Sequence, residues 1–383
     1  MRIAIIGGKL QGLEAAYLAH KAGWETLIID KNPNAPAMGV CGRFIPFEFS
    51  LKDCVPRGCP EVDCILPAIE DTVVLDAVQR WAAMEGIPLA FDIKAHHFTR
   101  SKSRSDALFK KMDLSAPRPW PDCGFPVVVK PDEGSGSRGV QVFHDQQNFL
   151  SSRFSQPTSA EAVVMQEYIV GSSHSIEVIG VPGNYTSFQV TDLGMDKDHD
   201  CKRVIAPTRM AAGLIDRFAT MAIAVAEAVE LKGIMDVEVL LSKGELHVLE
   251  IDARLPSQTP IAVYWSTGIN MVEQLANLFL GEKSLPSLIK PRFVLLEHIQ
   301  VRGTAIDFLG EHIMAGDGPL ALKSDFFGAD EALTSYTPGK CCWLATMIFS
   351  GTSRHEVSRK RKECYDRIIR HMEPSPRWAL VWT

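Results

Sequence analysis

Three acidic residues stand close together in the sequence, on two apolar segments that have the pattern of one β-hairpin. Glu238 lies in the first segment, and Glu250 and Asp252 lie in the second. The residues between them, 242–245, read Ser-Lys-Gly-Glu and have the composition of a tight turn. Because strand side chains alternate between faces, Glu250 and Asp252 share one face. The turn sets Glu238 roughly opposite Glu250, so the hairpin gathers three carboxylates on one side.

The opposite face of this hairpin is apolar and is predicted to form core. It carries Val237, Val239, Leu241, Leu249 and Ile251. Carboxylates this close repel one another, and burial makes their charge costlier, so cations are expected among them, beginning with Arg254. Hard oxygen ligands suit Mg²⁺ or Mn²⁺, and Mg²⁺ commonly joins carboxylates to substrate phosphates. We therefore predict a metal site, with a solvated polar face on an edge hairpin as the alternative.

A glycine- and serine-rich loop lies earlier in the chain. Lys130 stands near the end of an apolar strand, and the loop 132–138 reads Asp-Glu-Gly-Ser-Gly-Ser-Arg before Gly139 opens the next strand. The backbone N–H groups of such a loop can gather around an anion. A helix over 105–112 is predicted before it. The alternative is an ordinary flexible hairpin loop.

The N-terminus has the order strand, glycine turn, helix and strand. The strands are predicted at 2–7 and 25–30, which indicates a βαβ unit that opens a doubly wound parallel sheet. The turn at 7–12 is G-G-x-x-x-G, which differs from the dinucleotide motif and fits tight strand-to-helix packing equally well. Residues at the carboxyl ends of strands contact ligands in such sheets. We therefore predict substrate contacts at Lys9, Leu10, Gln11 and Glu70.

The length of 383 residues and a hydrophobic content of 46% allow two or three domain cores. We expect domains at 1–95, 96–180 and 181–383. The net charge is −6 and the basic residues are scattered, so no nucleic-acid partner is expected. We find no apolar run of membrane-spanning length and no leader, and nine cysteines do not form a closed set of disulfides. The expected location is therefore the cytoplasm, without a membrane partner. The sequence does not determine whether the protein forms an oligomer.

Taken in order, these segments resemble the ATP-grasp superfamily across essentially the whole chain. The resemblance implies an α/β (α+β) fold in which a Rossmann-like N-terminal domain precedes two antiparallel-sheet lobes that clamp ATP. By position, it implies that Lys130 contacts the phosphates and acts in catalysis. It also implies a phosphate flap made of Ser135, Gly136, Ser137 and Gly139, and an adenine hinge made of Glu167, Tyr168 and Ile169.

The same resemblance assigns the hairpin. It implies Mg²⁺ on Glu238, Glu250 and Asp252, with two ions expected, and it places Arg254 near the transferred phosphoryl group as a catalytic and substrate-binding residue. Arg104 matches a phosphate contact more loosely. The chain departs from the family at Asp252, where asparagine is usual, and at 173–174, where a ribose-binding glutamate is often found. Glu177 is therefore predicted to bind either the ribose or a substrate amino group.

The activity that this resemblance implies is the ATP-dependent joining of a carboxylate to an amine through an acyl phosphate. Within the superfamily, the segments 1–12 and 250–258 are most similar to the amino-acid ligases of pyrrolysine biosynthesis. That similarity implies 3-methyl-D-ornithine or D-ornithine and L-lysine as small-molecule substrates, with release of ADP and phosphate. The alternatives are another amino-acid ligase, a carboxylase, an NAD-dependent oxidoreductase and a non-catalytic ATP sensor.

Overall fold

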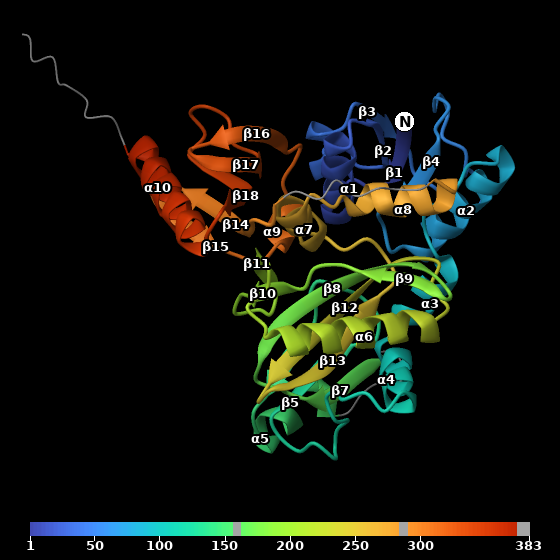
Figure 1. The fold of residues 1–383 in the computed structure, drawn as a ribbon, viewed down its shortest axis with the longest axis vertical. Helices are drawn as coiled ribbons and strands as arrows, with labels where there is room; N and C mark the ends of the chain where they lie inside the picture. Colours follow the sequence, from blue (N-terminus) through green and yellow to red (C-terminus); the bar gives the residue numbers. More distant parts are fainter. Residues whose placement is uncertain (156–161, 283–289, 374–383) are drawn as a thin grey trace, which may run out of the picture.

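The computed structural model describes residues 1–155, 162–282 and 290–373. Within these ranges the chain forms three β-sheets with helices packed against them (Figure 1). The N-terminal sheet and the C-terminal strands of the largest sheet lie in the upper half of the view. Below them lie the small sheet and the strands β8 (Ser172–Val181), β12 (Gly233–Ser242) and β13 (Glu245–Asp252) of the largest sheet.

The N-terminal sheet is parallel. In the described residues its order in space is β3 (Arg43–Pro46), β2 (Glu25–Asp30), β1 (Arg2–Ile6) and β4 (Cys64–Pro67). Ile3 and Ile5 of β1 share a core with α1 (Leu10–Lys21), α7 (Thr259–Thr267) and α8 (Met271–Leu280). Ala4 and Ile6 point to the other core, which contains α2 (Thr72–Glu85). Helices thus cover both faces, which confirms the doubly wound prediction.

The small sheet is antiparallel and holds the predicted flap. Its order is β6 (Gln141–Phe143), β5 (Val127–Pro131) and β7 (Val163–Glu167). Phe149 of α5 (Gln146–Leu150) and Phe154 of the short 3₁₀ helix η2 (Arg153–Ser155) bury its apolar face. The helices α3 (Ile93–Thr99) and α4 (Lys102–Lys111) connect it to the N-terminal sheet, where η1 (Pro36–Gly39) is a second 3₁₀ turn.

The large sheet is antiparallel throughout. In the described part of the chain its order is β13 (Glu245–Asp252), β12 (Gly233–Ser242), β8 (Ser172–Val181), β10 (Thr191–Met195), β11 (Cys201–Ala206), β14 (Phe293–Arg302), β18 (Cys342–Gly351), β17 (Ala329–Thr334) and β16 (Ala321–Phe326). Two short strands extend it, β9 (Asn184–Ser187) on β8 and β15 (Ala305–Phe308) on β14. The helix α6 (Ala212–Ala228) packs on β8 and β12 through Phe218 and Val225. The helix α10 (Arg354–Met372) packs on β14 and β18 through Tyr365 and Ile368, and α9 (His312–Ala315) lies near β18.

Sheet membership bears on the predicted domains. β8 pairs with β10 and β12 of the large sheet, although the predicted second domain extends to residue 180. The three-domain division remains a proposal, and this pairing favours a second boundary between β7 and β8. The segment 88–91 adds an isolated parallel bridge to the N-terminal sheet, between Leu89 and Ile65. No helix in the described ranges is long and apolar enough to cross a membrane.

Candidate active site

The acidic hairpin forms with the predicted register. β12 and β13 pair Glu238 with Glu250 and Asp236 with Asp252. The two-residue turn places Lys243 at a φ of 50° and Gly244 at 85°, the positive values that a tight hairpin turn of this length requires. The sequence therefore located both the hairpin and the pairing of its acids.

The apolar face of the hairpin differs at one position. A β-bulge between Glu238 and Val239 shifts the register, so that Val239 pairs with Val248. Val248 is fully buried, whereas Leu249 is half-buried. The prediction that Leu249 belongs to the core is therefore wrong, because the bulge inserts it as the unpaired residue.

The carboxyl groups of this hairpin strongly affect one another. Burial and the charges of Asp236 and Glu250 raise the pKa of Glu238 well above its ordinary value. Burial raises the pKa of Asp236 to about 7, although a hydrogen bond from Ser175 opposes the shift. For Asp252, Arg254 and His96 outweigh burial, and its pKa is lowered.

These shifts test whether the donor set fits a metal ion. Glu238, Glu250 and Asp252 offer oxygen ligands from paired strand positions. The pKa of Glu238 is raised by burial and by neighbouring acids, a shift that a nearby cation would oppose. Hard divalent cations prefer such oxygen donors. The three side chains therefore fit Mg²⁺, and their assignment as its ligands is a proposal.

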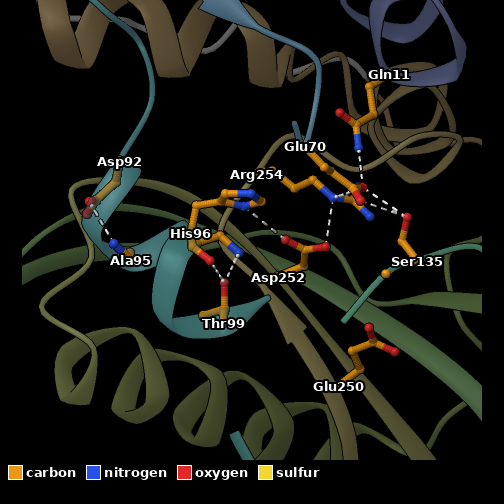
Figure 2. Close-up of polar contacts among 12 residues, drawn as sticks. Gln11, Glu70, Asp92, Ala95, His96, Thr99, Ser135, Glu250, Asp252 and Arg254 are labelled. Atoms are coloured by element: carbon orange, nitrogen blue, oxygen red, sulfur yellow. Dashed lines mark hydrogen bonds and ion pairs between the residues drawn. The ribbon is translucent and has the colours of Figure 1, made fainter. Parts of the chain in front are cut away.

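Arg254 forms the positive centre of the site (Figure 2). Its Nε lies 2.7 Å from Asp252 Oδ2 and 2.9 Å from Glu70 Oε1. His96, which is buried, places its Nδ1 3.7 Å from the other Asp252 oxygen. Because its two carboxylate partners come from β13 and from the segment after β4, Arg254 joins the hairpin to the N-terminal sheet.

Two lysines bring further positive charge to the acids. Lys130 on β5 is buried, which lowers its pKa, while the charge of Glu250 opposes that shift. Lys102, in the first turn of α4, places its Nζ 3.2 Å from Glu250 Oε1 and 2.6 Å from the carbonyl oxygen of Gly134. The structure therefore brings Lys102 and Lys130 close to the acidic hairpin, and the contact of Lys130 with phosphates remains a proposal.

The sequence analysis missed Lys102 and expected Arg104 instead. Arg104 is exposed, and its Nη1 donates to the carbonyl oxygen of His97 at 3.2 Å. The helix was expected to begin at residue 105, but α4 begins three residues earlier, after the capping residue Ser101. Ser101 was therefore the signal, because an N-cap serine fixes which residues occupy the first turn.

The flap residues lie over the site. Gly134, Gly136, Ser137 and Gly139 all have positive φ values, which makes this a tightly coiled loop. Ser135 Oγ donates to Glu70 at 2.9 Å from Oε1 and 3.1 Å from Oε2. Ser137 Oγ donates to the carbonyl oxygen of His199 at 2.6 Å. The loop thus bonds to the N-terminal domain on one side and to the β10–β11 connection on the other.

The predicted adenine hinge lies between the small and large sheets. The N–H of Glu167 donates to the carbonyl oxygen of Arg118 at 2.8 Å, and the N–H of Tyr168 donates to that of Pro126 at 3.1 Å. Both carboxylate oxygens of Glu167 accept bonds from the Arg118 guanidinium. Both N–H groups are therefore occupied by carbonyl oxygens of the segment that precedes β5. Adenine contacts at Glu167, Tyr168 and Ile169 remain a proposal.

The predicted substrate contacts separate into two groups. Gln11 reaches the site, since its Nε2 donates to Glu70 Oε1 at 3.0 Å. Leu10 is half-buried, and Lys9 is exposed at the start of α1. Glu177 on β8 has no exposed surface, and its neighbour across the strands is Asp236. Burial and the charge of Asp236 raise the pKa of Glu177 to about 8. Glu177 is thus closed to solvent in this structure, and its contact with the ribose or a substrate amino group remains a proposal.

A cavity of about 130 Å³ lies beside the hairpin, the flap and the start of α7. Among the described residues its wall includes Arg254 and six acids, which are Asp200, Asp236, Glu238, Glu250, Asp252 and Glu311. Gln258 in this wall has a φ of 75° and a buried amide oxygen without a hydrogen bond in the described structure. Strained backbone and unsatisfied polar atoms concentrate where ligands bind.

Comparison with known proteins supports this arrangement. The ATP-grasp domain family matches residues 101–258. The 3-methyl-D-ornithine–L-lysine ligase of Methanosarcina mazei is 31% identical over 370 residues, which are 94% of this chain and 94% of that protein. The ligase of the same name from Methanosarcina barkeri is 30% identical over 94% of this chain and 95% of that protein.

Solved structures show the same fold. An ADP complex of N5-carboxyaminoimidazole ribonucleotide synthetase superposes with a TM-score of 0.71 at 17% identity, over 97% of this chain and 98% of that one. The biotin carboxylase of Campylobacter jejuni has a TM-score of 0.69 at 16% identity, over 97% of this chain and 95% of that one. The chain belongs to the ATP-grasp family and is an ATP-dependent carboxylate–amine ligase of that type.

Proposed function

We propose that the enzyme joins the carboxylate of 3-methyl-D-ornithine to the ε-amine of L-lysine, a step of pyrrolysine biosynthesis. Support comes from the two Methanosarcina ligases, which match nearly the whole chain at about 30% identity. D-Ornithine is the close analogue for the carboxylate substrate. The cofactors in this proposal are ATP and Mg²⁺, with two ions expected and Mn²⁺ as a substitute.

The charge of the cavity is the observation that carries this proposal. Asp200, Asp236 and Glu311 are acids of its wall that lie outside the proposed metal ligands. Burial raises the pKa of Glu311 and brings that of Asp236 to about 7. A bound ammonium group would offset the cost of ionising such acids. Diamino acids bring ammonium groups, whereas a bicarbonate substrate would add negative charge.

The residues of the site suit phosphoryl transfer followed by amide formation. Mg²⁺, when bound to Glu238, Glu250 and Asp252, would neutralise charge on the ATP phosphates. Lys130 and Arg254 place fixed positive charge where the γ-phosphoryl group moves to the substrate carboxylate. The lysine ε-amine, with an ordinary pKa of about 10.4, loses a proton and attacks the acyl phosphate. The flap keeps water from that intermediate.

Two observations disfavour an NAD-dependent oxidoreductase. Both Asp30 oxygens accept backbone N–H groups, from Gly8 at 2.6 Å and from Asn32 at 2.7 Å, so the acid is engaged where a ribose would bind. A side chain at Gly12 would meet the carbonyl oxygen of Gly7 at 2.0 Å. The glycine turn therefore serves close packing of α1 on β1.

A non-catalytic ATP sensor would not need Lys130 and Arg254 together with the three acids.

The test is a panel of substrate pairs with MgATP. We expect phosphate release and a new amide, identified by mass spectrometry, for D-ornithine or 3-methyl-D-ornithine with L-lysine. The control is the Arg254→Ala variant, which should form little product from the same pair. Amide formation only with other amino acids would refute the substrates. Carboxylation of an acceptor by bicarbonate, without amide formation, would refute the amide-ligase assignment.

A further inference from the structure

Glu70 is the meeting point of three separate parts of the site (Figure 2). It follows β4 in the N-terminal domain, and its carboxylate accepts from Ser135 of the flap and from Gln11 of α1. The same carboxylate lies 2.9 Å from Nε of Arg254 on the hairpin. One side chain thus connects the flap, α1 and the arginine, although these lie far apart in the sequence.

The contact with Arg254 fixes the direction of that side chain. Nε is held between Glu70 Oε1 and Asp252 Oδ2, at 2.9 and 2.7 Å. Both contacts are ion pairs, since Nε forms no hydrogen bond in the described structure, and they hold the guanidinium between the two carboxylates. The Glu70 side chain is 33% exposed and that of Arg254 13%, so the pair lies at the edge of the solvent-accessible site.

The contact with Ser135 holds the flap down. Ser135 reaches both oxygens of Glu70, and Ser137 bonds to the opposite side of the cavity at the His199 carbonyl. A hydrogen bond to a charged acceptor is stronger than one between neutral groups. The loop between these two serines lines the cavity. Release of Ser135 would therefore free the side of the flap that faces the N-terminal domain.

We propose that Glu70 is a positioning residue that latches the phosphate flap closed and orients Arg254 at the same time. The inference rests on the proposed ligase function. It differs from the prediction that Glu70 contacts substrate, because the latch acts before any amine arrives. The latch couples closure of the flap to the orientation of Arg254 for phosphoryl transfer. The closed flap keeps water from the acyl phosphate until the amine attacks its carbonyl carbon and phosphate leaves.

The first test measures the flap without any reaction. Hydrogen–deuterium exchange of residues 133–139 is compared in the wild type, Glu70→Gln and Ser135→Ala, with protein alone. We expect exchange to rise by about tenfold in Ser135→Ala, the order of effect of losing a hydrogen bond to a charged group. The rise should be smaller in Glu70→Gln, because the glutamine amide oxygen still accepts a weaker, neutral bond from Ser135. Glu48→Gln is the control, since it removes the same charge from a surface pair with Lys31 elsewhere in the domain. Equal flap exchange in the wild type and Ser135→Ala would overturn the latch.

The second test measures coupling. The ratio of phosphate released to amide formed should be near one in the wild type and should rise several-fold in Glu70→Gln and Ser135→Ala. Adding Ser135→Ala to Glu70→Gln should change the ratio by less than the sum of the two single effects, because both substitutions act on the same contact. A Glu70→Gln effect confined to KM for the amine, with an unchanged ratio, would show a substrate contact and refute the latch. If the wild type forms no amide at all, the proposed function fails, while the exchange test still decides the latch.

Discussion

Glu14 offers a test of how burial in this fold changes the pKa of an acidic side chain and, through it, the stability of the protein. It lies in α1, is 4% exposed, and its Oε1 accepts the N–H of Ile261 in the first turn of α7 at 2.7 Å. Burial raises the pKa of Glu14 to about 8, although backbone hydrogen bonds oppose the shift. In the folded protein it therefore holds a proton that the unfolded chain has lost above its ordinary value of 4.5.

The direction in which stability changes with pH follows from the number of protons that the folded and unfolded states bind. Between pH 4.5 and about 8 the folded state binds one more proton than the unfolded state at this residue, so stability falls as pH rises. The loss is about 1.4 kcal/mol for each pH unit, complete above the folded pKa and absent below the unfolded one. Glutamine has nearly the shape of protonated glutamate and keeps an oxygen for the Ile261 N–H. Glu14→Gln should therefore be nearly neutral at pH 5 and stabilising at pH 8.

The assay is urea denaturation of the wild type and Glu14→Gln at both pH values, in the same buffer and without ligands. We expect the variant's advantage in the free energy of unfolding to grow by about 1.4 kcal/mol per pH unit between them. Glu14→Ala is the comparison, because it leaves the Ile261 N–H unpaired and should destabilise the protein at both pH values. A difference between Glu14→Gln and the wild type that is the same at pH 5 and pH 8 would refute a raised pKa.

Other predictions concern the active site directly. Lys102→Ala should weaken ATP binding and raise KM for ATP, whereas Arg104→Ala should leave it nearly unchanged, in steady-state assays of phosphate release. Arg254→Ala should lower kcat by about 10²–10³-fold with a smaller effect on KM, as expected when a fixed charge near the reacting group is removed; a change in KM alone would contradict that role. Glu250→Ala should abolish turnover and weaken Mg²⁺ binding measured by calorimetry, and EDTA should abolish wild-type turnover in the same way.

The local parts of the site were predictable from the sequence. Period-two alternation and the turn composition located the hairpin. The pairing of Glu238 with Glu250 also depends on the bulge, because the two-residue turn alone would place Glu238 opposite Leu249. The position of the bulge was not predictable, because alternation alone does not show where an extra residue enters one strand. Its consequence is that Val248, and not Leu249, enters the core.

The distant parts were not predictable in the same way. The contact of Lys102 with Glu250 joins residues 148 positions apart, and no pattern in either segment encodes it. The partners of the hinge N–H groups, the Arg118 and Pro126 carbonyls, lie more than 40 positions earlier in the chain, and no pattern in the hinge segment indicates them. Nor did any pattern link Glu70 to Ser135 and Arg254, although each was singled out separately for its own chemistry.

The difference between the predictable and the unpredictable parts of the site has a physical basis, because the charged side chains come from different parts of the chain. The proposed metal ligands come from adjacent strands of one hairpin, and that hairpin is fixed by its own core face through Val237, Val248 and Ile251. The cations Lys102 and Lys130 come from α4 and β5, and Glu70, which orients the hairpin's Arg254, comes from the N-terminal domain. Arg254 and Lys130 lower the pKa of Glu238, whereas burial, Asp236 and Glu250 raise it, so loss of these cations would raise that pKa further. The complete charge pattern therefore exists only when the N-terminal domain and both lobes are assembled around the hairpin.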